Sequence, residues 1–340
     1  MSAKRMSKAG HGEDEIIDRI QRRVPSSPGG ALRLGIGDDA AVIRPRPGTE
    51  WALTSDQFLE GVHFLADAHP AEAIGYKGLA RATSDLGAMG AKPRFFLLSL
   101  SLPVERTSAW LDRMTSGLAR AARRFGLTLA GGDTARSTAR HPGISLDFMV
   151  MGEIAAGRAV TRGGAKPGDA IFVSGRLGAS QLGLELILRG IDRHRQWQPL
   201  LVPHFYPKLA IELGRWLAQR RLASAMMDIS DGLSTDLHRL CRASHVGSRV
   251  HQHQLPGVTV PEGLRKLGLD AQSLALHGGE DYGLLFTVSK PNVASIPRAF
   301  GGLRLTRIGE IVPGSGVTLL ADGVAAPLAP QGWDHFRPSR

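Results

Sequence analysis

Short segments rich in glycine and serine, each carrying acidic residues, recur along the chain far apart in sequence. They occupy residues 35–39, 54–56, 84–87, 131–134, 228–232 and 278–281. Because carboxylates repel one another, a fold that gathers them needs cations. Oxygen ligands with open, water-filled positions suit Mg²⁺, which commonly accompanies a nucleotide phosphate. An alternative is that each aspartate only caps a helix or shapes a turn, but six such segments in one chain favour a magnesium site.

Residues 35–40, Gly-Ile-Gly-Asp-Asp-Ala, superficially match a dinucleotide fingerprint. We reject this match because two carboxylates would face a pyrophosphate that needs bare backbone N–H groups, and because a strand is expected next instead of a helix. The P-loop pattern and the protein-kinase motifs are absent from the sequence. ATP, if it is bound, would therefore be held through metal-bridged phosphates.

The composition is that of a globular protein. The chain has 340 residues, enough for two domains, with 42% hydrophobic and 21% charged residues. The net charge of +11 raises the alternative of a nucleic-acid-binding protein. However, Lys and Arg never run longer than two, and aromatic residues make up only 6% of the chain. A positive surface would equally attract phosphate substrates, so we expect no nucleic-acid partner.

The single cysteine, Cys241, excludes an internal disulfide and a cysteine-based metal site and suggests a reducing, cytoplasmic location. No apolar run approaches the length of a transmembrane helix, so no membrane association is expected. Residues 1–12 are polar and basic and are interpreted as a disordered tail instead of a secretory signal.

Hydrophobic periodicity predicts an α/β protein with mixed sheets (α+β character) in place of one doubly wound sheet. Helices are expected at 13–23, 70–89, 105–125, 178–189, 208–222 and 232–244. Strands are expected at 40–44, 51–55, 94–102, 127–130, 144–154, 170–174, 225–229 and 282–288, with a short helix and two weak strands after the last of them. A boundary near 152–168 divides the chain into an N-terminal metal, ATP and dimerisation domain (13–155) and a C-terminal α/β domain (156–340).

The segment 228–232 is expected to join a strand to a helix. Asp228 would end the strand, and Ser230 or Asp231 would be the helix N-cap. In a functional interpretation, Asp228 binds metal and Ser230 binds phosphate or ribose. His63 follows a strand, where a lone histidine is commonly a surface or packed residue. The segment 278–281 precedes a strand, and its Glu-Asp pair is unusual for a purely structural turn.

These motifs, taken in order, resemble the thiamine-monophosphate kinase family from about residue 13 to 336. The matching pieces are Gly-Ile-Gly-Asp-Asp-Ala, Thr-Ser-Asp followed by Glu-Gly-Val-His-Phe, Ser-Asp-Leu-Gly-Ala-Met-Gly-Ala, Gly-Gly-Asp-Thr, Thr-Arg-Gly with Lys-Pro-Gly-Asp, Asp-Ile-Ser-Asp-Gly-Leu, Gly-Gly-Glu-Asp-Tyr and Gly-Trp-Asp-His-Phe. The aspartate-bearing pieces alone fit the wider superfamily of aminoimidazole ribonucleotide synthetase. Glu-Gly-Val-His-Phe and Gly-Trp-Asp-His-Phe narrow the resemblance to the thiamine kinase.

The resemblance implies a two-domain aminoimidazole ribonucleotide synthetase-like fold, whose N-terminal sheet forms a barrel across a homodimer. It implies several Mg²⁺ ions, ATP as co-substrate and thiamine monophosphate as substrate. The implied metal ligands are Asp39, Thr54, Ser55, Asp56, Asp85, Asp133, Asp228 and Asp231. The implied ATP-binding residues are Gly132, Asp133, Arg162 and Ser230. The implied substrate-binding residues are His63, Glu280 and Trp333. One departure is Gly283, where the family usually has an acidic residue.

The acceptor implied by this resemblance is a phosphate monoester, which is already largely a dianion at neutral pH. We therefore expect direct in-line transfer with no catalytic base. The nearest alternative is another ATP-dependent enzyme of the same superfamily. Two of its members, selenophosphate synthetase and the hydrogenase-maturation dehydratase, would call for a reactive residue near the N-terminus (cysteine or selenocysteine) and a C-terminal cysteine, respectively, and neither is present. A basic nucleic-acid-binding protein is the alternative from a different class.

Overall fold

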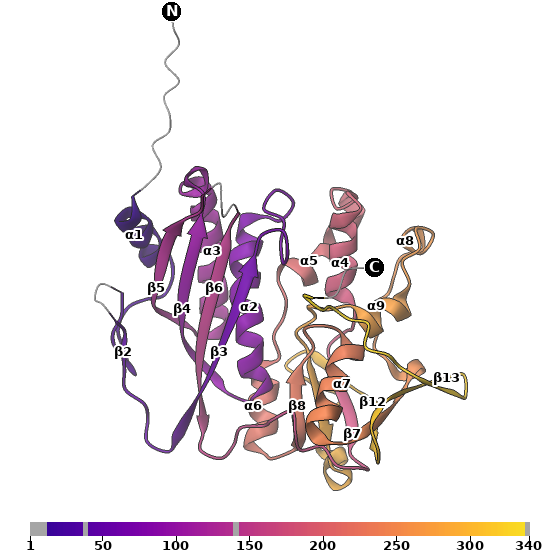
Figure 1. Cartoon of the computed structure of the whole chain (residues 1–340). Coiled ribbons are helices and arrows are strands. Elements are labelled where there is room, and N and C mark those ends of the chain that lie inside the picture. Colours follow the sequence, from indigo (N-terminus) through magenta and orange to yellow (C-terminus); the bar gives the residue numbers. More distant parts are fainter. Residues whose placement is uncertain (1–11, 37–39, 139–142, 337–340) are drawn as a thin grey trace, which may run out of the picture. The chain divides into compact units, whose positions relative to one another are not determined.

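The computed structural model describes residues 12–36, 40–138 and 143–336. Its helices are α1 (Glu13–Arg23), α2 (Ala71–Ala88), α3 (Ala109–Phe125), α4 (Ala179–Leu188), α5 (Gln198–Phe205), α6 (Ile211–Gln219), α7 (Leu233–Ser244), α8 (Glu262–Arg265) and α9 (Ala271–His277). Its strands are β1 (Leu32–Leu34), β2 (Val42–Ile43), β3 (Thr49–Leu59), β4 (Lys92–Leu102), β5 (Thr128–Arg136), β6 (Ser145–Ala155), β7 (Ala170–Ser174), β8 (Ala223–Asp228), β9 (Gly247–His251), β10 (Leu284–Val288), β11 (Ala299–Phe300), β12 (Leu303–Val312), β13 (Gly316–Ala321) and β14 (Val324–Pro327). Figure 1 labels these elements where there is room.

The chain forms two compact units. Unit 1 comprises the described residues of Met1–Pro47, Ser55–Ala82 and Arg94–Met151. Unit 2 comprises those of Gly48–Thr54, Thr83–Pro93 and Gly152–Arg340. The elements β3, α2, β4 and β6 contribute residues to both units.

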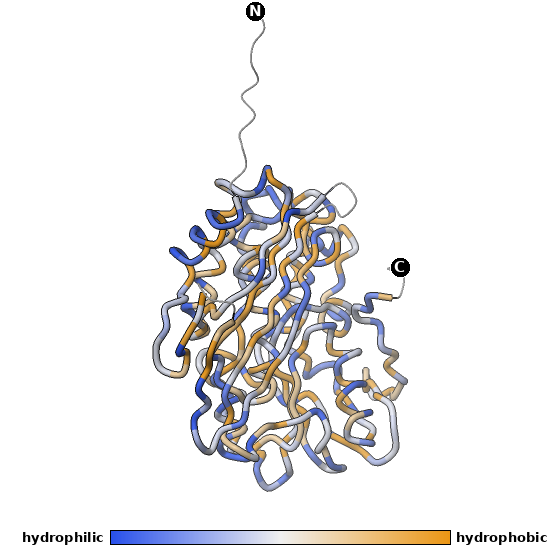
Figure 2. The backbone as a smooth tube through the Cα atoms, turned by 60° about the vertical axis from the view of Figure 1, so that its left-hand side comes forward, coloured by the Kyte–Doolittle hydropathy of each residue, from blue (hydrophilic) through white to orange (hydrophobic). Residues whose placement is uncertain are grey.

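The sheet built around unit 1 has the strand order β3-β6-β4-β5, with β4 and β5 parallel. Helices α2 and α3 lie along one face of this sheet (Figure 1). Alternation on β6 explains the packing: Phe148 is fully buried and lies against Gly78 of α2, whereas the next residue, Met149, is 41% exposed. Hydrophobic and hydrophilic residues alternate along the long strands in Figure 2.

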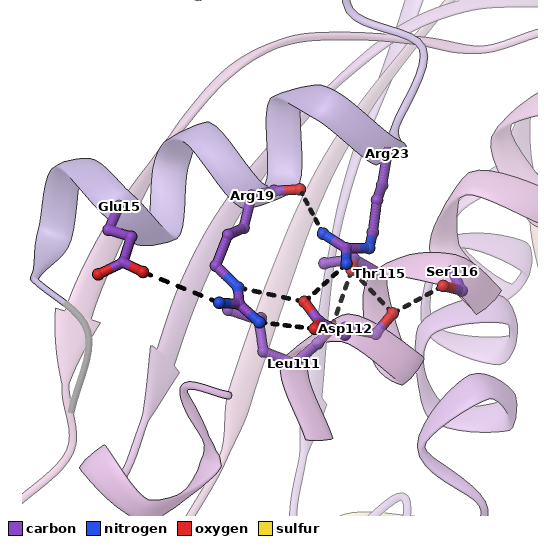
Figure 3. A network of polar contacts seen from close by, with 7 residues as sticks. All are labelled: Glu15, Arg19, Arg23, Leu111, Asp112, Thr115 and Ser116. Carbon is purple, nitrogen blue, oxygen red and sulfur yellow. Dashed lines mark hydrogen bonds and ion pairs between the residues drawn. The ribbon is translucent and has the colours of Figure 1, made fainter. Parts of the chain in front are cut away.

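A carboxylate ties α1 to α3 within unit 1. Asp112 of α3 accepts hydrogen bonds from Arg19 Nε at 3.1 Å and from Arg19 Nη2 at 2.6 Å. Arg23, one turn further along α1, lies 3.0 Å from the same carboxylate (Figure 3). Because Arg19 is a bidentate donor with only 17% of its side chain exposed, this contact fixes the orientation of α1 as well as its position.

The sheet of unit 2 has the order β14-β13-β9-β12-β7-β10-β8, with β11 paired to β12. Its pairs are antiparallel except β13 with β9. Every residue of β7 and β10 is buried. One face of these central strands packs against α7 through Leu237 and Leu240, and the other packs against α6 through Leu213 and Leu217. This sandwiching of a mixed sheet explains the continuous apolar runs in β7 and β10.

Several expected elements are confirmed, and others need correction. Helix α1 has the predicted bounds, and α2, α4 and α7 lie within a residue or two of prediction. The helix predicted at 105–125 begins only at Ala109, because Val104–Arg106 forms a separate 3₁₀ turn. The helix predicted at 208–222 is shorter, covering Ile211–Gln219. None of the helices in the described part of the chain combines the length and apolar character needed to cross a bilayer.

The strand predicted at 127–130 was expected to run into a Gly-Gly-Asp segment, but β5 continues through that segment to Arg136. Gly132 lets β5 approach the neighbouring strand closely, since a Cβ at this position would collide with the carbonyl oxygen of Leu98 on β4. A register shift between Phe96 and Leu97 marks the same place. Helix α5, which carries Pro203 in its interior, and strand β9 were not predicted.

Candidate functional site

An aspartate ends the edge strand of the unit 2 sheet. Asp228 is the last residue of β8 and is 2% exposed. The hydroxyl of Ser84, from the last turns of α2, donates a hydrogen bond to Asp228 Oδ2 at 2.8 Å. The prediction that Asp228 closes this strand is confirmed. A strand end and a helix end thus bring together residues 144 positions apart.

A second carboxylate lies close to the first. Asp85 follows Ser84 on α2, and Thr54 Oγ1 of β3 donates to Asp85 Oδ2 at 2.6 Å. Burial, followed by the charge of Asp85 and then that of Asp236, raises the pKa of Asp228 to about 8, while the Ser84 hydrogen bond and Arg162 act in the opposite direction. Two carboxylates whose charges act on each other in this way, each bonded by its own hydroxyl donor, favour a cation between them.

The loop after β8 is held by an acidic residue of the following helix. The N-cap of α7 is Gly232, with φ of 103°, so the prediction of Ser230 or Asp231 as the cap is wrong. The reason is that Asp236 in the first turn accepts the backbone N–H groups of Ser230 and Asp231, both at 3.1 Å. A carboxylate inside the helix therefore replaces a hydroxyl or carboxylate cap in front of it.

Arg239, one turn further along α7, neutralises this loop. It bonds Asp231 through a short contact and Asp236 Oδ1 at 3.0 Å. Burial, followed by the charge of Asp231, still raises the pKa of Asp236 to about 7, against the opposing effect of Arg239. Asp231, a predicted metal ligand, thus already has a cationic partner.

The segment that carries Glu280 lies beside this loop. Glu280 N donates to Ser230 O at 2.7 Å, and Tyr282 N donates to Ile229 O at 2.9 Å. Glu280 and Tyr282 have φ of 63° and 50°, values that L-residues rarely adopt. Ser230, predicted to bind ATP, and Glu280, predicted to bind substrate, therefore lie on hydrogen-bonded neighbouring segments.

Asp281, which lies between Glu280 and Tyr282 in sequence, is half-buried and accepts the N–H of Gly178 at 2.6 Å and of Ser180 at 3.1 Å, at the start of α4. Burial raises the pKa of Asp281 to about 7. Gly283, the departure from the family pattern, has a structural reason: a Cβ there would lie 2.5 Å from Ser174 O. A side chain at position 283 would push β10 away from the end of β7.

Trp333 lies beside α7. Its backbone N–H donates to Asp231 O at 2.9 Å, and Gly332 N donates to Thr235 Oγ1 at 3.0 Å. The C-terminal segment is thus anchored through its backbone, and the indole remains 41% exposed. It borders a groove of about 630 Å³ together with Arg239 and Arg242.

Apart from Arg162 of unit 2, the remaining described candidates belong to unit 1. Asp56 accepts a bidentate hydrogen bond from Arg81, at 3.0 Å for both oxygens. Asp133 lies on β5 opposite Ser99 and is exposed. His63 Nδ1 accepts the N–H of Leu59 at 3.0 Å.

His63 also stacks on Phe58 with ring centroids 5.8 Å apart. Ser55 is part of β3. Asp39 lies outside the described residues.

Within the described part of the chain, no three or more His, Cys, Asp or Glu side chains form a group able to hold a metal ion alone. The donor set around Asp85 and Asp228 nevertheless fits Mg²⁺, since it consists of carboxylate and hydroxyl oxygens. Magnesium commonly completes its shell with water and phosphate oxygens, so two protein carboxylates suffice.

Sequence reasoning missed Ser84, Asp236, Arg239 and Arg81. Ser84 could have been found, because it directly precedes Asp85 within a predicted site motif. Asp236 and Arg239 gave the common pattern of an exposed helix face and were therefore not distinguishable from solvated charges.

Models of two related domains match the chain. The AIR synthase related protein N-terminal domain matches residues 37–154, and the AIR synthase related protein C-terminal domain matches residues 166–322. Two structures of the hydrogenase maturation protein HypE, at 22% and 20% identity with TM-scores of 0.71 and 0.75, share this fold. The fold and the acidic site thus define an AIR synthase related protein with two mixed α/β domains.

Sequence relatives narrow the class. The chain is 36% identical over 332 residues to the thiamine-monophosphate kinase of Escherichia coli K12, covering 96% of this chain and 98% of the relative, and 33% identical to that of Bacillus subtilis, covering 90% and 94%. A crystal structure of the Stenotrophomonas maltophilia enzyme matches with 36% identity and a TM-score of 0.77, covering 92% of this chain and 96% of the other. The chain belongs to the thiamine-monophosphate kinase family.

Proposed function

We propose that the protein transfers the γ-phosphoryl group of ATP to thiamine monophosphate, producing thiamine diphosphate. The observation that carries this proposal is the similarity to AaThiL complexed with AMPPCP and TMP. That chain is 34% identical, with a TM-score of 0.74, and the match covers 96% of this chain and 97% of the other. A kinase related over this whole length has bound an ATP analogue and TMP together.

The proposed reaction does not need a general base. The acceptor phosphate is already largely a dianion at neutral pH, so the main difficulty is the approach of two polyanions. Two unit charges about 4 Å apart cost about 4 kcal/mol at an effective dielectric constant near 20. Positioning and charge compensation therefore account for most of the catalysis, and we propose direct in-line transfer without a phosphoenzyme.

We propose that Asp85 and Asp228 are central metal ligands, joined by Thr54 and by the other aspartates and Ser55 implied by the family resemblance. Bound Mg²⁺ would neutralise the phosphate oxygens and align the transfer. Ser84 holds the Asp228 carboxylate at 2.8 Å, so that carboxylate is oriented before any ion binds. Asp56 and Asp231 would have to share their carboxylates between metal and arginine.

The nucleotide would lie on Ser230 and Arg162, with Gly132 and Asp133 also contacting it. Thiamine monophosphate would lie on Glu280, His63 and Trp333. The thiazolium ring carries a permanent positive charge, which suits the Glu280 carboxylate and the exposed indole face of Trp333. The adjacency of the Ser230 and Glu280 segments supports this arrangement.

We further propose a cytoplasmic homodimer. On the N-terminal sheet, Phe148 is buried on the face that α2 covers, whereas Met149 points to the opposite face and is 41% exposed. A second copy would cover this face and complete the barrel implied by the family resemblance. Light scattering at micromolar concentration should give twice the chain mass, and a monomer would contradict the proposal.

The function is tested by incubating the protein with Mg²⁺, ATP and, separately, thiamine monophosphate and free thiamine. Thiamine diphosphate should form from the monophosphate, and free thiamine should stay essentially unphosphorylated because an alcohol acceptor needs a base. Asp228→Asn serves as the inactive control. Efficient phosphorylation of free thiamine, or turnover only with the substrate of an aminoimidazole ribonucleotide synthetase, would refute the proposal.

A further inference from the structure

A fully buried histidine lies beneath the Glu280 carboxylate. His204 of α5 is 0% exposed, and its Nδ1 lies 3.6 Å from Glu280 Oε2. The same Nδ1 lies 3.1 Å from Ser180 Oγ in the first turn of α4. The hydroxyl of Tyr282 approaches the other oxygen of Glu280 at 3.5 Å. The carboxylate is therefore flanked by polar groups on both oxygens.

The sequence brings His204 to this place through close helix packing. A Cβ on Gly183 of α4 would lie 2.8 Å from the Cβ of His204 and 3.0 Å from Leu200 O. The absence of a side chain at Gly183 thus lets α5 approach α4 closely enough for His204 to reach Ser180. A leucine at position 204 could fill the apolar volume, but it could not contact Glu280 or Ser180 through a polar atom.

Other hydrogen bonds also fix the segment around Glu280. Asp281 accepts the backbone N–H groups of Gly178 and Ser180 at the start of α4, and Glu280 N donates to Ser230 O. Glu280 itself adopts a left-handed φ of 63°. Such a backbone persists in a non-glycine residue where its surroundings determine it, and commonly where the side chain has a function.

A carboxylate repels a nitrogen lone pair, so the tautomer of His204 with a proton on Nδ1 fits this site. That proton can be shared between Ser180 Oγ and the field of Glu280. The carboxylate, 23% exposed, then keeps one defined orientation. A carboxylate with a fixed orientation is pre-organised to bind a cationic ring, because less side-chain entropy is lost on binding.

We propose that His204 is a positioning residue that orients the Glu280 carboxylate for the cationic part of thiamine monophosphate. The proposal rests on the function proposed above. It assigns to His204 an effect on the affinity for the phosphate acceptor and none on the affinity for ATP. His204 acts through Glu280 and does not touch substrate.

The test is a double-mutant cycle of His204→Leu and Glu280→Gln, with KM for thiamine monophosphate, KM for ATP and Tm measured for each variant. His204→Leu should raise KM for thiamine monophosphate about 10-fold and leave KM for ATP within about two-fold. His204→Asn, which keeps a polar group near the Nδ1 position, should recover most of the loss. In the Glu280→Gln background, His204→Leu should add less than about two-fold.

Thr287→Val is the matched control, because Thr287 is a fully buried polar residue of the same unit that bonds Ser224 at 2.7 Å. It should lower Tm without changing KM. An equal KM effect of His204→Leu with and without Glu280, or an unchanged KM, would overturn the proposal. If His204→Leu does not fold, the same cycle with His204→Met, which also lacks a polar hydrogen, decides. A wild-type protein that leaves thiamine monophosphate unphosphorylated would instead refute the proposed function, and this inference with it.

Discussion

Two pairs of aspartates lie near the short connection between β8 and α7: Asp85 with Asp228, and Asp231 with Asp236. The polar partners of the two pairs differ. Asp85 and Asp228 receive hydrogen bonds from the hydroxyls of Thr54 and Ser84. Asp231 and Asp236 share the guanidinium of Arg239. The pairs have similar residue types, but the hydrogen bonds to the first pair come from hydroxyl groups and those to the second come from a guanidinium.

This difference indicates which of the two pairs we expect to bind a metal ion. Burial raises the pKa of Asp228 to about 8 and that of Asp236 to about 7. For Asp236, a fixed guanidinium offsets part of the cost of keeping the charge. For Asp228, the Ser84 hydrogen bond and the charge of Arg162 favour the charged form, but burial and the charge of Asp85 outweigh them. Asp85 and Asp228, whose oxygens are bonded by hydroxyl groups, are therefore our stronger candidates for Mg²⁺, whereas Asp56 of unit 1, paired with Arg81, resembles Asp231 and Asp236.

The largest expected effect on activity follows from neutralising Asp228 or Asp85. Asp228→Asn or Asp85→Asn should each lower kcat by about 10³-fold or more, because charge compensation of several kcal/mol is lost from the transition state. Tm in the absence of Mg²⁺ should stay the same or rise, since a buried repulsion is removed. Steady-state kinetics and calorimetry with EDTA measure the two quantities.

Asp67→Asn is the control for these variants, because Asp67 carries a 94% exposed carboxylate on the surface of unit 1. It should change neither quantity appreciably. Wild-type activity of Asp228→Asn at ordinary Mg²⁺ would assign this residue a purely structural role and end the distinction between the two pairs.

The second effect is on stability and concerns Asp231 and Asp236. Arg239→Met should lower the free energy of unfolding by about 2 kcal/mol, because Asp236, fully buried as a side chain, loses its cationic partner. The figure is below that of a fully buried pair because Arg239 keeps 33% of its side chain exposed. Urea denaturation measures it.

Arg242→Met, one turn further along α7, is the matched control. Arg242 is exposed and should cost less than about 0.5 kcal/mol. Equal losses in the two variants would mean that Arg239 contributes only as a surface charge, and the contrast between the pairs would fail.

Part of this site could be predicted from the sequence because it depends on local order. Asp228 was recognisable as the end of a strand, since apolar residues precede it and a glycine-containing segment follows. The helical spacing likewise placed Asp85 within the helix predicted at 70–89. Short-range patterns of this kind report which element a residue occupies.

Pairing between distant elements could not be predicted. Nothing in the local sequence indicates that Arg239 reaches back to Asp231 or that Ser84 reaches Asp228, because such contacts depend on how β8, α2 and α7 meet. His204 lies in a short helix containing a proline, which a propensity argument rejects. Tertiary packing through Gly183 decided its place.

The third effect is the pH dependence of stability without metal. A carboxyl group whose pKa is raised on folding binds more protons in the native state, so stability falls as pH rises from the unfolded pKa, near 4, to the folded one. The windows are about pH 4–8 for Asp228 and about pH 4–7 for Asp236. Each group contributes at most about 1.4 kcal/mol per pH unit within its window.

Magnesium should separate the two contributions. Bound Mg²⁺ favours the Asp228 carboxylate and should flatten the slope of unfolding free energy between about pH 5 and 7, leaving the part due to Asp236. In Asp228→Asn the slope should already be smaller and should not respond to Mg²⁺. A wild-type slope that is identical with EDTA and with Mg²⁺ would contradict metal binding at Asp228.

The smallest expected effect tests the hydroxyl groups that donate hydrogen bonds to Asp85 and Asp228. Ser84→Ala removes the donor at 2.8 Å from Asp228. A hydrogen bond to a carboxylate favours its charged form, so its loss should raise the pKa of Asp228 further and weaken Mg²⁺ binding by about 1 kcal/mol, or about five-fold. A Mg²⁺ titration of activity at fixed ATP measures the shift. Ser116→Ala removes a helix hydroxyl bonded to the Asp112 carbonyl at 2.7 Å and should leave the titration unchanged. If Ser84→Ala also leaves it unchanged while Asp228→Asn abolishes turnover, the Asp228 carboxylate is held by its strand alone, and the hydroxyl contributes only packing.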